Sequence, residues 1–331
     1  MASIREVAKL AGVSPSTVSR VMNGTANVEE DKKQRVLAAI KETGFKPNEL
    51  ARALFKQSSK IIGVIVPNIE NPFYNELAKA VEEEAYRNGY RMLLCNSNNN
   101  TEKELMNIQI LDQMKADGII ILTHSDKTGR EIAGCQLPVV VVDRQLTGSG
   151  QSAYIEADHY KGGKMAMEHL LECGCRNIVF LRGPLGLSSG MHRYEGYQEV
   201  CTKAGIPEQY IDCLYDYEDG LRAAQELLER FPKADGIIAS NDMVAIASYK
   251  ILQNAGLRVP EDVQIIGFDN IRLSWLFTPE LTTVIQPITQ MGTLAVQIII
   301  KHSQGVPFQQ ENILDVSLVE RQTTRRKEKE L

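Results

Sequence analysis

The 331-residue sequence has no long hydrophobic run and no apolar segment at its N-terminus. Because no stretch of about 18 uncharged apolar residues is present, we expect no membrane-spanning helix. The first residues carry charges at Arg5, Glu6 and Lys9, which argues against a secretory signal peptide. These absences predict a cytoplasmic protein.

Residues that commonly form metal and redox sites are few and scattered. The five histidines include no HExxH motif, and among the six cysteines only Cys173 and Cys175 are close in sequence. Their spacing fits neither a CxxC redox motif nor paired zinc ligands. We therefore expect free thiols in a reducing compartment, no metal site and no cofactor.

Signatures of catalysis are also missing. The sequence has no GxSxG elbow, and Gly162-Gly163-Lys164 is followed by Met165, which breaks the phosphate-loop pattern. No pair of carboxylates stands beside a nucleophile. We expect no catalytic residues and a protein that is not an enzyme.

Charge is divided unevenly along the chain. Residues 1–60 hold 11 Lys and Arg against 6 Asp and Glu, a net charge of +5, whereas the whole chain carries −5. The rest of the chain therefore carries −10. A small basic head on a large acidic body is typical of a polyanion-binding module attached to another domain. At roughly 150 residues per domain, the length predicts two or three domains.

The basic head reads as three short helices. Residues 4–11 place four apolar side chains at helical spacing, and Gly12 follows where a left-handed helix cap is expected. Ser14 can cap a second helix that begins at Pro15. Two short helices joined by a glycine-containing turn form the helix-turn-helix unit. A third helix is expected over about residues 30–43, with a buried stripe of Val36, Leu37 and Ile40.

In such a unit, the N-terminal residues of the second helix face base edges in the major groove. Here these residues are Pro15, Ser16 and Thr17, with Arg20 one turn further and Val18 facing inward. Arg20 can bond either a guanine or a phosphate. An ordinary three-helix cap on the larger domain is the alternative, but the basic excess and the polar positions favour DNA.

Residues 47–60 form a short amphipathic segment that runs into a polar linker. Alone, this segment is too short to be a stable helix. It can fold on binding, paired with the same segment of a second subunit, and Leu54 can then wedge into a minor-groove base step. A plain linker helix explains the pattern equally well.

From residue 61 the pattern changes to alternating strands and helices. Ile61–Val66 is a continuous apolar run of the kind buried on both faces. Because the alternation occurs twice, it predicts two doubly wound α/β lobes with parallel sheets. Ligands of such lobes bind beyond the carboxyl ends of the strands, here between the lobes. The further strands are expected at 91–95, 118–122, 139–143, 178–182, 236–240 and 263–268.

Polar and aromatic residues follow the predicted strand ends. Carboxylates and amides bond several hydroxyls, arginine donates in a fixed fork, and aromatic rings pack on C–H faces, which is the inventory that a sugar needs. Individually, Asp143-Arg144 can be a structural ion pair and Asn241 a helix cap. The candidate effector-binding residues are Asn71, Phe73, Tyr74, Asp143, Arg144, Arg193, Asn241, Asp269 and Gln286.

Residues 3–23 resemble the helix-turn-helix of the LacI-type bacterial repressors, and Pro47–Leu54 resembles the hinge helix of that family, with Leu54 at its intercalating position. The body resembles periplasmic sugar-binding proteins. The resemblance covers essentially the whole chain. It implies a homodimer that binds a palindromic operator and whose DNA affinity changes when a small molecule closes the lobes. The DNA contacts implied in addition are Ser3, Ser19 and Asn23.

The resemblance also implies domain boundaries. The helix-turn-helix domain would span 1–46 and the hinge helix with its linker 47–60. The effector-binding and dimerisation domain would span 61–331, with an N-lobe at about 61–158 and 287–320 and a C-lobe at about 159–286.

Within this family, the body is similar to the ribose-binding branch. The resemblance implies release from the operator by a sugar, D-ribose, whose ring Phe73 and Tyr74 would sandwich with Tyr217 of the second lobe. Met191 stands where ribose-binding proteins carry a ligand arginine. Either Arg193 takes over, or the pocket admits another pentose or a phosphorylated sugar. Motifs that carry this similarity are 71–74, 142–145, 240–242, 267–269 and 285–287, and segments 178–184 and 321–325 resemble ribose operon repressors of low-GC Gram-positive bacteria.

Three other functions remain as alternatives. A catabolite-control regulator would use a phosphocarrier protein as corepressor, and residues 270–274 resemble the region that contacts it. A pentose-processing enzyme with a basic tail would need a nucleophile or metal set that the sequence does not show. A nucleoid-type structural binder would show no sugar response.

Overall fold

The computed structural model describes residues 2–23, 28–45, 58–123, 125, 128–146 and 152–326. The chain forms two compact units, residues 1–59 and 60–331. The predicted hinge helix, including Leu54, lies outside the described residues. Among the helices described, none is long and apolar enough to cross a membrane.

The first unit contains the three expected helices, α1 (Ile4–Ala11), α2 (Pro15–Asn23) and α3 (Glu30–Thr43). Ser3 caps α1 by accepting from the backbone N–H of Glu6, and the Glu6 carboxylate accepts from the Ser3 N–H in return. Gly12 ends the helix at φ 64°, the left-handed conformation that the sequence predicts there. The Ser14 hydroxyl accepts from the Thr17 N–H at 3.1 Å, which confirms its capping role.

The core of this unit is small, because its helices are short and amphipathic. Val18 of α2 faces inward as predicted. The predicted stripe on α3 is wrong at one position, since Leu37 is 46% exposed. The buried residues of this core are Val7, Ala8, Ala11, Val18, Val36 and Ala39, with Ile4, Val21 and Ile40 packed against them.

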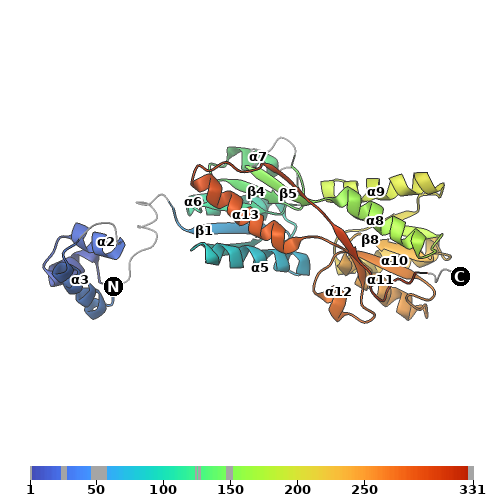
Figure 1. The fold of residues 1–331 in the computed structure, drawn as a ribbon, viewed down its shortest axis with the longest axis horizontal. Coiled ribbons are helices and arrows are strands. Elements are labelled where there is room, and N and C mark those ends of the chain that lie inside the picture. Colours follow the sequence, from blue (N-terminus) through green and yellow to red (C-terminus); the bar gives the residue numbers. More distant parts are fainter. Residues whose placement is uncertain are drawn as a thin grey trace. The chain divides into compact units, whose positions relative to one another are not determined.

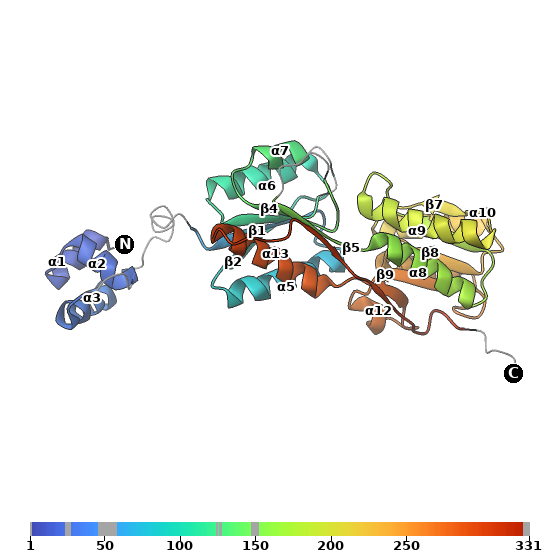
Figure 2. The ribbon, with the colours of Figure 1, turned by 45° about the horizontal axis from the view of Figure 1, so that its top comes forward.

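The second unit consists of two α/β lobes, as the alternating pattern predicts (Figure 1). The first lobe has a parallel sheet in the order β11-β5-β4-β3-β1-β2. Helices α5 and α13 cover one face of this sheet and α6 and α7 the other, as Figure 2 shows. The bounds are β1 (Ile61–Val66), α5 (Pro72–Arg87), β2 (Arg91–Asn96), α6 (Thr101–Gln113), β3 (Gly118–Ile121), α7 (Thr128–Gly134), β4 (Val139–Val142), β5 (Ala153–Ala157), α13 (Ile288–Ser303) and β11 (Glu311–Leu314).

The second lobe has the sheet order β12-β10-β9-β8-β6-β7, in which only β12 is antiparallel to its neighbour. Helices α8 and α9 pack on one face, and α10 and α11 on the other. The bounds are α8 (His159–Glu172), β6 (Ile178–Arg182), α9 (Ser188–Ala204), β7 (Tyr210–Asp212), α10 (Tyr217–Arg230), β8 (Gly236–Ala239), α11 (Asp242–Asn254), β9 (Gln264–Asp269), α12 (Leu273–Leu276), β10 (Thr282–Ile285) and β12 (Ser317–Val319).

The chain passes between the lobes three times, after β5, after β10 and between β11 and β12. The last passage is the red segment that crosses from one lobe to the other in Figure 1. Because of this passage, the lobe limits of the structure differ from the expected ones, which assigned all of residues 287–320 to the first lobe. Thr283 of β10 pairs with Val319, so β12 belongs to the second lobe.

Gly162 and Gly163 belong to the sequence segment that fails to match a phosphate loop. In the structure, both residues have a packing role. A Cβ at Gly163 would collide with the backbone carbonyl of Arg193 on α9, and one at Gly162 would collide with the Phe268 ring. The two glycines therefore let α8 lie directly against α9 and the sheet, which brings Arg193 to the interlobe side.

The turn after β9 connects the second lobe to the first. Ile271 is fully buried in the core of the first lobe, together with Leu77. The Arg272 N–H donates to the Glu76 carboxylate on α5 at 2.6 Å. Asn270 and Ser274 lie in the segment that resembles a phosphocarrier contact. The Asn270 Oδ1 atom and the Ser274 hydroxyl both accept hydrogen bonds from the Arg321 guanidinium. This segment therefore serves contacts within the chain.

Candidate functional site

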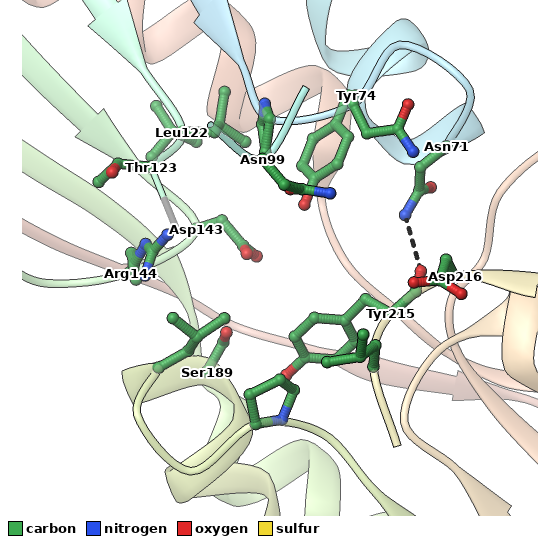
Figure 3. A pocket seen from close by; sticks show the side chains of 16 residues that line it. Asn71, Tyr74, Asn99, Leu122, Thr123, Asp143, Arg144, Ser189, Tyr215 and Asp216 are labelled. Atoms are coloured by element: carbon green, nitrogen blue, oxygen red, sulfur yellow. Dashed lines mark hydrogen bonds between the residues drawn. The ribbon is translucent and has the colours of Figure 1, made fainter. Parts of the chain in front are cut away.

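A cleft of about 290 Å³ lies between the lobes at the carboxyl ends of the strands (Figure 3). Its volume is near the lower end of the roughly 300–1,000 Å³ of small-molecule sites, which suits a monosaccharide. A smaller hollow adjoins the cleft and shares four lining residues with it. The hollow is lined by eight of the predicted effector residues, Asn71, Phe73, Tyr74, Asp143, Arg193, Asn241, Asp269 and Gln286, and by Tyr215.

Two predicted residues are placed differently. Arg144 lines the wider cleft beside Asp143 rather than the hollow. Tyr217 is the first residue of α10 and lines neither space, whereas Tyr215 lines both. Figure 3 shows Tyr74 and Tyr215 on opposite sides of the cleft. The second-lobe aromatic that faces Tyr74 is therefore Tyr215, which sequence reasoning missed.

The Tyr215 backbone joins the two lobes. Its carbonyl accepts from Asn241 Nδ2 at 3.0 Å and from Asn71 Nδ2 of the first lobe at 3.4 Å. Both asparagines are also helix caps, because their Oδ1 atoms accept from the N–H groups of Val244 and Phe73. The capping alternative for Asn241 is thus confirmed, and the cap also places the amide at the wall of the hollow.

Room for the Tyr215 ring comes from two glycines. A Cβ at Gly183 would lie 2.6 Å from the Tyr215 ring, and one at Gly190 would collide with the Pro184 carbonyl oxygen and lie 3.1 Å from the Tyr215 hydroxyl. These distances are shorter than ordinary van der Waals contact, so a side chain at Gly183 would displace the tyrosine, whereas one at Gly190 would first displace the Pro184 backbone.

Arg193 lies in the second turn of α9. Its guanidinium stacks on the Phe268 ring with 3.7 Å to the centroid. It donates to the Ser240 carbonyl at 2.5 Å and to His159 Nδ1 at 3.3 Å, and lies 3.8 Å from the Asp269 carboxylate. These partners fix the orientation of the arginine before any effector binds.

Burial and neighbouring arginines have opposing effects on the pKa values of the carboxyl groups in the cleft. Burial raises the pKa of Asp143 to about 6, against the opposing effect of the Arg193 and Arg144 cations. Burial also raises the pKa of Asp269, against Arg193 and the hydrogen bond from Gln286. Asp242, fully buried behind Asp269, has its pKa raised by burial and by the Asp269 charge.

Three buried polar atoms of the site have no hydrogen-bond partner within the described part of the chain. They are Asp143 Oδ1, the Tyr215 hydroxyl and Gln286 Oε1. Leaving a buried polar group unpaired costs about 1–3 kcal/mol, and such groups are rare in native proteins. Three of them around one small space offer hydrogen-bonding capacity that a polar ligand can use.

The predicted DNA-contact residues lie on and beside α2. Pro15, Ser16 and Arg20 are exposed, and Thr17 and Ser19 are half-buried. The Ser16 and Thr17 hydroxyls both lie within hydrogen-bond distance of the Ser14 hydroxyl, which fixes the start of the helix. The Ser3 hydroxyl accepts from Glu6 at the start of α1, and Asn23 ends α2.

A helix-turn-helix unit and a two-lobed body with a polar interlobe cleft define the class of regulators that join a DNA-binding head to a periplasmic-binding-protein-like body. The model of bacterial regulatory proteins of the lacI family matches residues 3–48, and that of the periplasmic binding protein-like domain matches residues 167–324. A ribose operon repressor from Halalkalibacterium halodurans is 38% identical over 98% of both chains. The chain belongs to the LacI family of bacterial regulatory proteins.

Two solved structures extend this similarity. The lac repressor dimer bound to operator and the anti-inducer ONPF has a TM-score of 0.88 at 26% identity, covering 97% of this chain and 98% of that one. A LacI-family regulator from Enterococcus faecium with bound ribose has a TM-score of 0.72 at 28% identity, covering 81% of this chain and all of the other. These relatives are transcriptional regulators and not enzymes, as the missing catalytic motifs predict.

Proposed function

We propose that this chain is a sequence-specific DNA-binding repressor of a sugar uptake or utilisation operon, and that a bound monosaccharide, D-ribose first among candidates, releases it from its operator. The observation that carries the proposal is the set of three unpaired buried polar atoms around the cleft of about 290 Å³ between two tyrosines and the hollow that adjoins it. The ribose operon repressors among its relatives and the ribose-bound neighbour support the choice of sugar.

In this proposal, the sugar ring lies between Tyr74 and Tyr215. The Phe73 ring packs edge-on against the Tyr74 ring, with 5.4 Å between the ring centroids. Tyr217 has no place in the sandwich. The hydroxyl groups bond the polar side chains of both lobes, so one ligand holds the lobes together. The hydroxyl-binding residues are Asn71, Asp143, Arg144, Arg193, Asn241, Asp269 and Gln286.

A phosphorylated sugar fits this cleft less well than a neutral one. Asp143 and Asp216 line the cleft together with Arg144, and Asp269 lines the hollow together with Arg193, which is already bonded to Ser240 and stacked on Phe268. A phosphate dianion would therefore meet three carboxyl groups against two arginines. We accordingly place the neutral pentose ahead of its phosphate.

At the DNA, we propose a homodimer that reads a palindromic operator through the two copies of α2. Pro15, Ser16 and Arg20 would face base edges, because they are exposed at the start and along one face of that helix. Phosphate and flanking contacts would come from Ser3, Thr17, Ser19 and Asn23, and Leu54 would kink the operator centre. Domains at 1–46, 47–60 and 61–331 fit this division of labour.

The test is fluorescence anisotropy on an operator selected from random duplexes with the purified protein. Titration with D-ribose, D-ribose 5-phosphate, D-xylulose and D-glucose should show D-ribose lowering operator affinity by about 5–150-fold, the usual range of allosteric coupling. An unchanged operator affinity at saturating D-ribose would refute the inducer, and failure to select any sequence would refute the repressor. A phosphorylated phosphocarrier protein, added alone, should have no effect.

A further inference from the structure

His159 is a buried histidine that touches residues of both lobes but does not line the cleft. It is the first residue of α8, directly after the passage from β5 to the second lobe, and only 1% of it is exposed. The Asp158 carboxylate caps the helix by accepting from the Lys161 N–H, which fixes the backbone at this point. The imidazole is therefore held where the chain crosses between the lobes.

Its two ring nitrogens have different partners. Nδ1 lies 3.3 Å from Nε of Arg193, and Nε2 lies 3.2 Å from the backbone carbonyl of Asp143. An arginine can only donate and a carbonyl can only accept, so Nδ1 must be the acceptor and Nε2 must carry the proton. Only this neutral tautomer satisfies both bonds.

Both partners belong to the proposed effector site, and they come from different lobes. Asp143 follows β4 of the first lobe, and Arg193 lies on α9 of the second. Asp143 has a φ of 74°, a left-handed conformation that costs a non-glycine residue free energy and requires support from its surroundings. The hydrogen bond from His159 to the Asp143 carbonyl supplies part of that support.

We propose that His159 is a positioning residue for effector binding, which orients Arg193 with one ring nitrogen and Asp143 with the other. The inference rests on the proposed sugar-binding function of the cleft. The charged groups that face the ring are Asp143 from β4 and Arg193 and His192 from α9, with Asp269 of β9 on the far side of Arg193. Burial and the Arg193 cation hold the pKa of His159 well below its ordinary value, in keeping with a neutral ring.

Three substitutions separate the two bonds. His159→Asn keeps an acceptor near the position of Nδ1 and loses the reach to Asp143. His159→Gln keeps a donor near the position of Nε2 and loses the bond to Arg193. His159→Leu removes both. By calorimetry, D-ribose affinity should fall at least tenfold in His159→Leu and by a smaller factor in each of the other two.

His169 supplies the matched control. It lies on the same helix, is 5% exposed, and bonds the Thr324 hydroxyl at 2.9 Å, with no contact to a residue of the cleft among those described. His169→Leu should lower the melting temperature as much as His159→Leu does, but leave D-ribose affinity within about twofold. Equal affinity losses in both leucine variants would show a general structural effect and overturn the inference.

The inference and the proposed function fail in different ways. If the wild-type protein binds no pentose of the panel, the proposed function is wrong. If the wild type binds D-ribose and His159→Leu binds it within twofold of the wild type, the positioning role is wrong. If the wild type binds another pentose instead, the same variants are measured with that pentose, and the same criterion applies.

Discussion

Lowering the pH from about 7.5 to about 5 should weaken D-ribose binding by at least about tenfold. In the free cleft, burial raises the pKa of Asp143 to about 6, although about a fifth of its side chain remains exposed there. A sugar hydroxyl donates to the ionised carboxylate, whose population falls to roughly one-tenth one pH unit below the pKa. A tenfold loss corresponds to about 1.4 kcal/mol of binding free energy. The raised pKa of Asp269 acts in the same direction.

Calorimetry at fixed ionic strength across this pH range measures the effect, with circular dichroism to verify that the protein stays folded. Asp143→Asn should bind more weakly at neutral pH and show a flatter pH profile, because the amide does not titrate. Equal D-ribose affinity at both ends of the range, within twofold and in folded protein, would refute the reasoning.

Protonation of Asp143 should weaken sugar binding but increase the stability of the fold. A raised pKa means that the native state holds the proton more tightly than the unfolded chain does. Asp143 therefore stabilises the fold below about pH 4, and this contribution is lost as the pH rises through about 6. Asp143→Asn should raise the free energy of unfolding at neutral pH, on the order of 1–3 kcal/mol, in urea titrations. Unchanged stability would show that the carboxylate is well solvated.

The other predictions concern single contacts. Tyr215→Ala should lower D-ribose affinity at least tenfold in calorimetry, whereas Tyr217→Ala should change it less than twofold; the reverse order would restore the original assignment. Gly183→Val should also weaken D-ribose binding, because its side chain displaces the Tyr215 ring. Gly12→Ala should destabilise the head by about 1 kcal/mol, measured by thermal unfolding of the full chain, since φ there is 64°. Arg20→Ala should reduce operator affinity in anisotropy, and unaltered affinity and sequence preference would exclude the residue from the interface.

The site could be predicted from sequence wherever a strand end could be found. Parallel strands place their carboxyl ends at one edge of each sheet, and Asp143 and Asp269 follow or end strands of different lobes, β4 and β9. They lie near each other because ligands of two-lobed α/β proteins bind where the carboxyl edges of the two sheets face a common cleft. Tyr215 was missed because β7 has only three residues, at the edge of its sheet, with alternating exposure. Without that strand, nothing in the sequence distinguishes Tyr215 from Tyr217.

Side-chain partners were beyond sequence reasoning for another reason. Arg193 bonds His159 because α8 lies against α9, and the distance between these helices depends on Gly162 and Gly163. Leu37 has the right spacing for a buried stripe on α3, yet the three-helix core closes around Ala39 instead. The partners of Arg193 and the exposure of Leu37 depend on how helices and strands pack on one another. The sequence pattern of a single helix carries no information about that packing.

The order in which the chain completes its lobes has a consequence for synthesis on the ribosome. Helix α13 and strand β11, residues 288–314, cover and extend the first lobe's sheet, although the rest of that lobe ends at β5. Until these residues emerge, the sheet face around Val64 and Val140 lacks the residues Met291 and Val296 that bury it. The DNA-binding head is therefore synthesised first, and the first lobe of the body is completed only near the end of synthesis. A prematurely terminated chain would thus carry a complete head without a lobe able to sense sugar, and its exposed apolar face would mark it for proteolysis or aggregation.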